Sequence, residues 1–246
     1  MNQFANKTAL VVGGTSGIGK ATTDALLAGG ATVHVVGRSA TTNAGNQHAH
    51  QVDISDRNAV EKLVNSIGGL DNLDYLVNAS GIFGPKPFLE HTVEDYDSYL
   101  DLNRGFFFIT QAAANKMSGT GGGSIVNIGS MWAKQAVSAT PSSAYSMQKA
   151  GLHSLTQHLA LELAGNNIRV NAVSPAVVTT SAYDGVFGGP EKATEALKGF
   201  NAFHPIGRTG TSTDVADSVL FLLSDKSSWI TGTILDVDGG VMAGRN

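Results

Sequence analysis

Short, continuous apolar runs alternate with longer stretches of helical periodicity along nearly the whole chain. The apolar runs lie at 9–12, 32–36, 75–77, 125–128, 170–173 and 234–237, with a more polar strand-like run at 48–52. Continuous apolar strands are typical of parallel sheets that are buried on both faces, and the crossovers between them are right-handed. The alternation therefore predicts an α/β chain with a doubly wound Rossmann fold, in which about seven parallel strands carry helices on both faces.

Helices are expected in the intervals between these strands. The residue pattern indicates long helices over 96–117 and 143–164. Ser55 is expected to cap a helix that runs to about residue 67. The interval 39–52 is unusually short and rich in Thr, Asn, Gly and Ala, so the helix expected there should be truncated or replaced by a loop.

The chain is expected to form one domain, residues 1–246. Its 246 residues, 42% of them hydrophobic, can bury a sizeable core, and no linker, internal repeat or low-complexity stretch divides them. The N-terminal residues lack the basic and apolar regions of a secretion signal, and no apolar run approaches the ~18 residues of a membrane helix. We therefore expect a cytoplasmic protein without a membrane partner.

Charge and residue content argue against several kinds of chemistry. A formal net charge of −4, with ten Lys and six Arg dispersed along the chain, leaves no basic stripe for nucleic acid. The absence of cysteine excludes disulfides, thiolate nucleophiles and cysteine-ligated metals. His48 and His50 alternate on a strand without a nearby carboxylate pair, so we interpret them as structural and predict no metal site.

Three glycines, spaced Gly13-x-x-x-Gly17-x-Gly19, join the first strand to the first helix. Glycines allow positive φ angles, and they let backbone N–H groups and the helix N-terminus approach a pyrophosphate. A tight turn without a ligand is the alternative, but the position after the first strand of an α/β chain favours a dinucleotide site.

Arg38 stands at the end of the second strand, where NAD-selective sites place an acidic residue on the ribose 2′-hydroxyl. A missing carboxylate and an adjacent guanidinium suit a 2′-phosphate. We therefore expect NADP(H) to be preferred and NAD(H) to be possible. The alternative is that Arg38 is a solvated loop residue and both cofactors are accepted.

Tyr145 and Lys149 are four residues apart on a predicted helix, so they share a face. An ammonium beside a phenol favours the phenolate, which makes a tyrosine usable in proton transfer. Two unrelated surface residues would give the same spacing by chance. The pair gains weight from the strand-like run before it, which ends at Gly129 and Ser130.

These motifs together resemble the short-chain dehydrogenase/reductase family, and the resemblance covers essentially the whole chain. The residues that carry it occur in the family's order: the glycine turn, Asp53, Asn78 to Gly81, Asn103, Ser130, Tyr145, Lys149, Asn171, Pro175, Ile230-Thr231-Gly232 and Asp238-Gly239-Gly240. The resemblance implies a single-domain Rossmann enzyme that transfers a hydride between a nicotinamide cofactor and a carbonyl or alcohol carbon.

The resemblance also implies roles for individual residues. Tyr145 would protonate the carbonyl oxygen, Ser130 would orient that carbonyl, and Lys149 would bind the nicotinamide ribose and, with the oxidised nicotinamide, lower the tyrosine pKa. Asn103 would hold a water that links Lys149 to solvent. The implied cofactor-binding residues are Gly13, Thr15, Ser16, Gly17, Ile18, Gly19, Arg38, Asp53, Ile54, Asn78, Ala79, Gly81, Tyr145, Lys149, Pro175, Val178 and Thr180. Asp53 has a turn or helix-entry role as its alternative.

The chain departs from the family pattern at a few positions. Val12, Ser80 and Ala176 replace the usual Thr, Ala and Gly of three motifs. Ser130 and Tyr145 are fifteen positions apart, about two more than is common in the family, and Ser138 is an alternative to Ser130.

An aromatic segment at 181–205 with glycine hinges is typical of a substrate lid, although packed aromatics are common at such spacing. With Phe83 and Trp132 nearby, we expect an apolar or aromatic carbonyl substrate. His153 and His158, which follow Lys149, are interpreted as helix-packing or subunit contacts.

The leading hypothesis is thus an NADP(H)-dependent carbonyl reductase or alcohol dehydrogenase, assembled as the homotetramer common in the family. One alternative is a dinucleotide-binding protein whose site is regulatory or structural, which four filled catalytic positions argue against. An epimerase or dehydratase of the related larger fold is another, but its glycine spacing differs and it usually has a longer C-terminal half.

Overall fold

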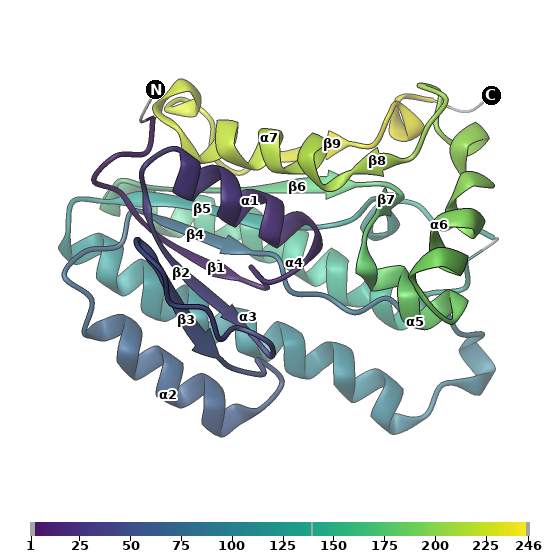
Figure 1. Cartoon of the computed structure of the whole chain (residues 1–246), viewed down its shortest axis with the longest axis horizontal. Coiled ribbons are helices and arrows are strands. Elements are labelled where there is room, and N and C mark those ends of the chain that lie inside the picture. Colours follow the sequence, from purple (N-terminus) through teal and green to yellow (C-terminus); the bar gives the residue numbers. More distant parts are fainter. Residues whose placement is uncertain (1–2, 139, 245–246) are drawn as a thin grey trace.

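The computed structural model describes residues 3–138 and 140–244. Its main feature is a seven-stranded parallel sheet with the strand order β3-β2-β1-β4-β5-β6-β9 (Figure 1). The strands are β1 (Thr8–Val12), β2 (Thr32–Gly37), β3 (Gln47–Gln51), β4 (Tyr75–Asn78), β5 (Gly123–Ile128), β6 (Ile168–Pro175) and β9 (Ile234–Val237). The order reverses direction between β1 and β4, which is the switch point where doubly wound sheets bind ligands. The predicted fold class is confirmed.

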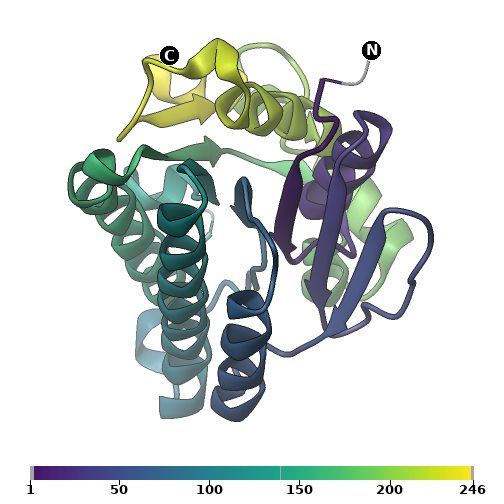
Figure 2. The same ribbon diagram turned by 90° about the vertical axis from the view of Figure 1, so that its left-hand side faces the viewer.

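Helices cover both faces of this sheet (Figure 2). One face carries α1 (Gly17–Ala28) and α7 (Ser212–Leu223), and the other carries α2 (Arg57–Gly68), α3 (Val93–Gly119) and α4 (Ser143–Glu162). Alternate residues of β1 supply the two cores: Leu10 and Val12 pack toward α2, α3 and α4, whereas Ala9 and Val11 pack toward α1 and α7. Both faces of the strand are therefore apolar, as a doubly covered sheet requires.

Side chains with carboxylates fix the starts of two helices on the α2–α4 face. Thr92 and Asp95 form a capping box, in which each side chain accepts the other's backbone N–H, and α3 begins three residues before the predicted position. The expected cap of α2 was wrong: Asp56 accepts from the N–H groups of Asn58 and Ala59. Ser55 instead bonds to Asp53 in the preceding turn.

The connection between β2 and β3 is a loop without a helix, as its length predicts. Histidines of the two strands that the loop joins pack on one another: the ring of His34 in β2 stacks on that of His48 in β3 with centroids 4.9 Å apart, and His34 Nδ1 lies 3.0 Å from His50 Nε2. Burial, with the neighbouring imidazoles, lowers the pKa of His34 to about 4. The cluster agrees with a structural interpretation of His48 and His50, with His34 as a member that the sequence pattern did not indicate.

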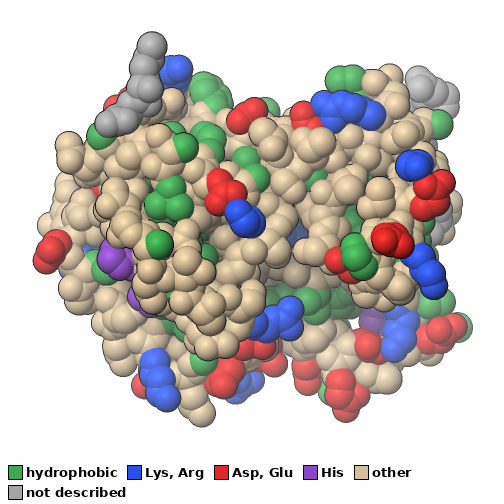
Figure 3. Space-filling view, in the orientation of Figure 1, with side chains coloured by type: hydrophobic (Ala, Val, Ile, Leu, Met, Phe, Trp, Pro, Cys, Tyr) green, Lys and Arg blue, Asp and Glu red, His purple; other side chains and the backbone are tan. Residues whose placement is uncertain are grey.

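The segment after β6 forms a small unit at the carboxyl edge of the sheet (Figure 1, right). It contains β7 (Val178–Thr179), α5 (Asp184–Phe187), α6 (Pro190–Lys198) and β8 (Gly210–Thr211), and β7 pairs with β8. Figure 3 shows charged side chains of both signs scattered over one face of the molecule, without a basic stripe. Within the described ranges, every helix is too short or too polar to cross a membrane.

Candidate active site

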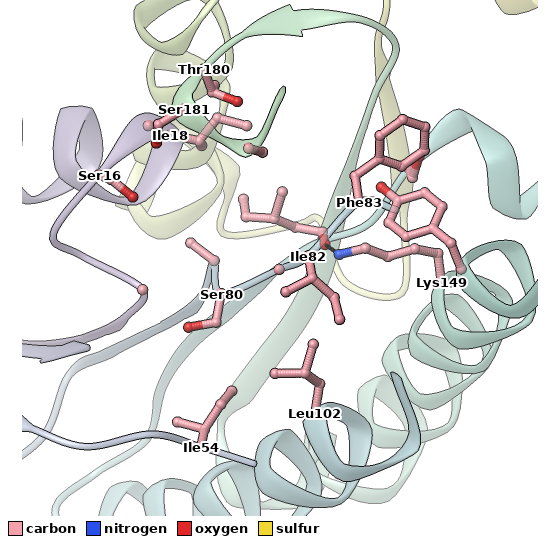
Figure 4. A pocket seen from close by; sticks show the side chains of 18 of the residues that line it. Ser16, Ile18, Ile54, Ser80, Ile82, Phe83, Leu102, Lys149, Thr180 and Ser181 are labelled. Atoms are coloured by element: carbon pink, nitrogen blue, oxygen red, sulfur yellow. Dashed lines mark hydrogen bonds between the residues drawn. The ribbon is translucent and has the colours of Figure 1, made fainter. Parts of the chain in front are cut away.

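A cleft of about 710 Å³ lies at the carboxyl ends of the central strands. Figure 4 shows Lys149 reaching into it from α4, with Ser16, Ile18, Thr180 and Ser181 on the opposite side. The predicted site residues that line it are Gly13, Thr15, Ser16, Gly17, Ile18, Arg38, Asp53, Ile54, Ala79, Gly81, Ser130, Tyr145, Lys149, Pro175, Val178 and Thr180. Loops far apart in sequence thus converge on one site, because parallel strands bring their carboxyl ends to one edge.

Three predicted residues lie behind the cleft wall. Gly19 packs under the Gly13 carbonyl so closely that a Cβ would overlap it. The Asn78 amide is buried and donates to Thr110 Oγ1 at 2.9 Å and to Asn127 Oδ1 at 2.8 Å. Gly19 therefore allows the close packing beneath the glycine turn, and Asn78 joins β4 to α3 and β5 through buried hydrogen bonds; both lie outside the cleft lining.

Asn103 is the third residue behind the wall, and Gln148 is its partner. The Asn103 amide donates to the Gln148 carbonyl oxygen, and the Gln148 amide donates to Asn103 Oδ1, both at 3.1 Å. Gln148 is buried and directly precedes Lys149 in α4. The pair ties α3 to α4 at the level of Lys149, a contact that the sequence motif did not predict.

The glycine turn has the geometry of an anion cradle. Gly13 has φ +84° and presses on the backbone of Ser80, and Gly17 has φ +51° beside Thr180, so a side chain is strained or excluded at both positions. Within the described part of the chain, no side chain caps the start of α1 at Ser16. Its first N–H groups therefore face the cleft and fit a pyrophosphate.

One end of the cleft is built around Arg38 and Asp53. Asp53 Oδ1 accepts from the Ser55 N–H at 3.0 Å and from the Ser55 hydroxyl at 2.7 Å, and the hydroxyl bond, with Arg38 nearby, lowers the pKa of the carboxyl. The Arg38 carbonyl accepts from Gln51 at 3.0 Å, which fixes its backbone and leaves the guanidinium exposed at the rim. Asp53 thus stabilises the turn through Ser55 and also lines the cleft.

Tyr145 and Lys149 lie together at the opposite end. Lys149 Nζ donates to the Ile128 carbonyl oxygen at 2.8 Å and lies 5.8 Å from the centroid of the Tyr145 ring. Burial raises the pKa of Tyr145 to about 12, partly opposed by the Ser130 hydroxyl, and burial lowers the pKa of Lys149 to about 8. In this structure burial dominates, and Lys149 does not lower the pKa of the phenol.

Ser130 begins the turn that follows β5. Its Oγ accepts from the Trp132 N–H, and its own N–H donates to His153 Nε2, both at 3.3 Å. Ser138 is exposed and lies outside the cleft lining. The geometry favours Ser130 over Ser138, and it gives the buried His153 a contact with the site that helix-packing arguments did not indicate.

Aromatic rings form the wall beside Tyr145. The Phe83 ring lies 5.0 Å from the Tyr145 ring, 5.5 Å from that of Tyr183 and 5.8 Å from that of Trp132, measured between centroids. Tyr183 in turn stacks on Phe187 of α5 at 6.4 Å. The Tyr145 end of the cleft is thus bordered by aromatic rings from four separate segments.

One face of α3 also lines the cleft, which the sequence reasoning missed. Its members are spaced three and four residues apart, as helix geometry requires of one face: Glu94, Asp97, Ser98, Asp101 and Leu102. That spacing was the available signal. Other lining residues outside the predicted set are Gly37, Val52, Ser55, Ser80, Ile128 and Gly129, whereas Ser181 and Ala182 belong to the predicted lid segment.

Comparison with known proteins agrees with this geometry. A family model described as Enoyl-(Acyl carrier protein) reductase matches residues 12–242. The chain is 36% identical to L-xylulose reductase of Bos taurus and 36% identical to carbonyl reductase [NADPH] 2 of Sus scrofa, with 98% of each chain covered in both cases. A solved structure of ElxO with NADP bound superposes with a TM-score of 0.86 at 27% identity, covering 97% of this chain and 99% of that one.

Whole-length similarity and the arrangement of the glycine turn, Ser130, Tyr145 and Lys149 around one cleft lead to the same assignment. The chain is an oxidoreductase-type protein that belongs to the short-chain dehydrogenase/reductase family.

Proposed function

We propose that the protein transfers a hydride between NADP(H) and the carbonyl carbon of a ketone or aldehyde, reversibly with the secondary or primary alcohol. One observation carries this proposal: Ser130, Tyr145 and Lys149 meet at one end of a cleft whose other end is a glycine cradle suited to a pyrophosphate. When bound, the reduced nicotinamide supplies the hydride, so the chain's own residues need only orient the carbonyl and supply a proton.

Tyr145 is the proton donor in this proposal. Burial keeps its phenol protonated well above neutral pH, as a general acid must be, and the O–H gives its proton to the oxygen of the carbonyl while the carbon accepts the hydride. The Ser130 hydroxyl donates a hydrogen bond to the same oxygen. Lys149 holds the nicotinamide ribose, and its ammonium, 5.8 Å from the centroid of the Tyr145 ring, favours the resulting phenolate.

Asn103 supports the proton path by positioning α4. Its reciprocal bonds with Gln148 fix the turn of α4 that carries Lys149. The water that the family resemblance implies at Asn103 uses the remaining hydrogen-bonding capacity of its side chain, because an amide has two donors and two lone pairs.

The cofactor preference follows from the rim of the cleft. β2 ends at Gly37 and is followed by Arg38, so the position where NAD-selective sites carry an acidic residue holds a guanidinium instead. A guanidinium binds a 2′-phosphate through paired N–H donors. Similarity to carbonyl reductase [NADPH] 2 and to ElxO, solved with NADP bound, supports NADP(H) as the cofactor.

The proposed substrate is an apolar or aromatic carbonyl compound. The Phe83 ring contacts the rings of Tyr145, Trp132 and Tyr183, and buried Val177 and Leu197 belong to the same apolar cluster as Trp132. Segment 181–205 closes over this end as a lid. We further propose a homotetramer, supported by apolar side chains left exposed on α3 and α4, such as Phe107 and Leu161.

The test is loss of NADPH absorbance against a panel of alkyl and aryl ketones and aldehydes. Tyr145→Phe should lower kcat by about 100-fold or more, because it removes the proton donor. Tyr75→Phe removes a buried phenol at the far end of β4 and should leave kcat unchanged. If NADPH binds, as followed by its fluorescence, and no carbonyl is reduced, the non-catalytic alternative replaces this proposal.

A further inference from the structure

We propose that His153 is a positioning residue for Ser130: its imidazole accepts the hydrogen bond of the Ser130 backbone N–H and so holds the serine hydroxyl toward the substrate carbonyl. The inference rests on the proposed function, in which that hydroxyl orients the carbonyl. His153 itself lies outside the cleft lining and does not touch the reacting atoms.

The first argument comes from where the β5 ladder ends. Gly129, one residue past β5, still donates its N–H to the Val173 carbonyl of β6 at 2.8 Å. Ser130 is the next residue, and the partner of its N–H is His153 Nε2 at 3.3 Å, in a buried position. A buried N–H without a partner is costly, so the imidazole satisfies a group that the strand cannot.

The second argument is the spacing along α4. Tyr145, Lys149 and His153 are successive residues four apart, and therefore lie on one face of the helix. Lys149 bonds to the carbonyl of Ile128 and His153 bonds to the N–H of Ser130. Two successive turns of α4 thus fix the backbone on either side of Gly129.

Close packing supports the same conclusion. A Cβ at Gly129 would overlap His153 Nε2, so the imidazole lies directly against the glycine backbone. Only a residue without a side chain leaves room for the ring at this level. The Gly129-Ser130 pair and His153 therefore form one unit.

The protonation state fits an acceptor. Burial, together with the cationic Lys134 and Lys149, lowers the pKa of His153 to about 4, and Asp236 opposes this while pairing with Lys134 at 2.6 Å. The imidazole is thus neutral around pH 7. With Nε2 accepting, the proton resides on Nδ1.

The test compares two substitutions at His153 with a matched control. His153→Leu, which lacks an acceptor, should lower kcat for carbonyl reduction about tenfold with KM for NADPH unchanged, because the lost bond orients Ser130 and not the cofactor. His153→Gln can place an amide oxygen where Nε2 lies and should restore kcat to within about threefold of the wild type. Gln157→Leu makes a comparable polar-to-apolar change at an exposed position of α4 and should have no effect.

Two results would overturn the proposal: wild-type kcat in His153→Leu, or a Gln variant as impaired as the Leu variant with normal NADPH binding. A second measurement does not depend on activity or on the variants folding. Imidazole ¹⁵N shifts of the wild type should show Nε2 unprotonated and Nδ1 protonated between about pH 6 and pH 8. A proton on Nε2 refutes the contact, whereas a wild type that reduces no carbonyl refutes only the proposed function.

Discussion

Replacing Lys149 by Met should stabilise the free protein while removing its activity. Lys149 is 4% exposed, and burial lowers its pKa from 10.5 to about 8, which corresponds to about 3 kcal/mol of unfavourable energy for the ammonium at pH 7. The methionine side chain avoids that cost, but losing the hydrogen bond to the Ile128 carbonyl destabilises the folded protein by about 1 kcal/mol. The expected net gain at pH 7 is about 2 kcal/mol in the free energy of unfolding.

The pH dependence of the free energy of unfolding tests independently whether the buried Lys149 ammonium destabilises the folded protein. Between the folded pKa near 8 and the unfolded pKa of 10.5, the unfolded chain holds the lysine proton and the folded chain has released it. Stability therefore rises with pH in this window, by about 2 kcal/mol between about pH 7 and pH 9.5. The rise should be absent in Lys149→Met.

Urea denaturation at both pH values measures these quantities for the wild type, for Lys149→Met and for Lys62→Met. Lys62 is an exposed lysine of α2, so its replacement should change neither the stability nor its pH dependence. Equal stability of the wild type and Lys149→Met at pH 7, together with a wild-type stability that stays flat up to about pH 9.5, would refute the reasoning.

Three further substitutions test other parts of the cleft. Arg38→Ala should raise KM for NADPH about tenfold and leave KM for NADH unchanged in steady-state assays, and equal effects on both would contradict a 2′-phosphate contact. Gly19→Ala should lower the free energy of unfolding of the cofactor-free protein by about 2 kcal/mol in urea, because the Cβ overlaps the Gly13 carbonyl, and a loss confined to cofactor affinity would show that the turn relaxes. Phe83→Ala should raise KM for aryl ketones about tenfold without changing KM for NADPH, and an unchanged aryl-ketone KM would exclude the aromatic wall from substrate binding.

Local patterns predicted the sheet well because buried parallel strands leave a continuous apolar signature. β9 was predicted at its observed bounds, 234–237, and the missing helix between β2 and β3 followed from chain length alone. The start of α3 was missed by three residues because a capping box, and not an apolar residue, sets it. The glycine turn and the Tyr145–Lys149 pair were predictable as motifs, because the residues of each motif lie close together in the sequence.

Contacts between distant elements were not predictable in this way. Nothing in the order of residues indicates that Gln148 bonds to Asn103, forty-five positions away, or that the N–H of Ser130 meets His153. The same holds for the ionisation of Tyr145, whose pKa depends on its burial and on contacts with Ser130 and Tyr99, both distant in sequence. Such properties arise from packing, which a single sequence does not display.

Two hydrogen bonds tie α4 directly to the end of β5, in addition to the loop that joins these two elements in the sequence. Ile128 and Ser130 are held by Lys149 and His153, so the backbone at Ser130 is tied directly to α4 as well as through the loop that begins at Met131, whose Trp132 N–H donates to the Ser130 hydroxyl. That loop has its own attachments, including the bond from the Lys86 N–H to the Pro141 carbonyl at 2.7 Å. Substitutions near Pro141 that reshape this loop leave both bonds from α4 to the end of β5 in place, so the Ser130 backbone keeps its second anchor.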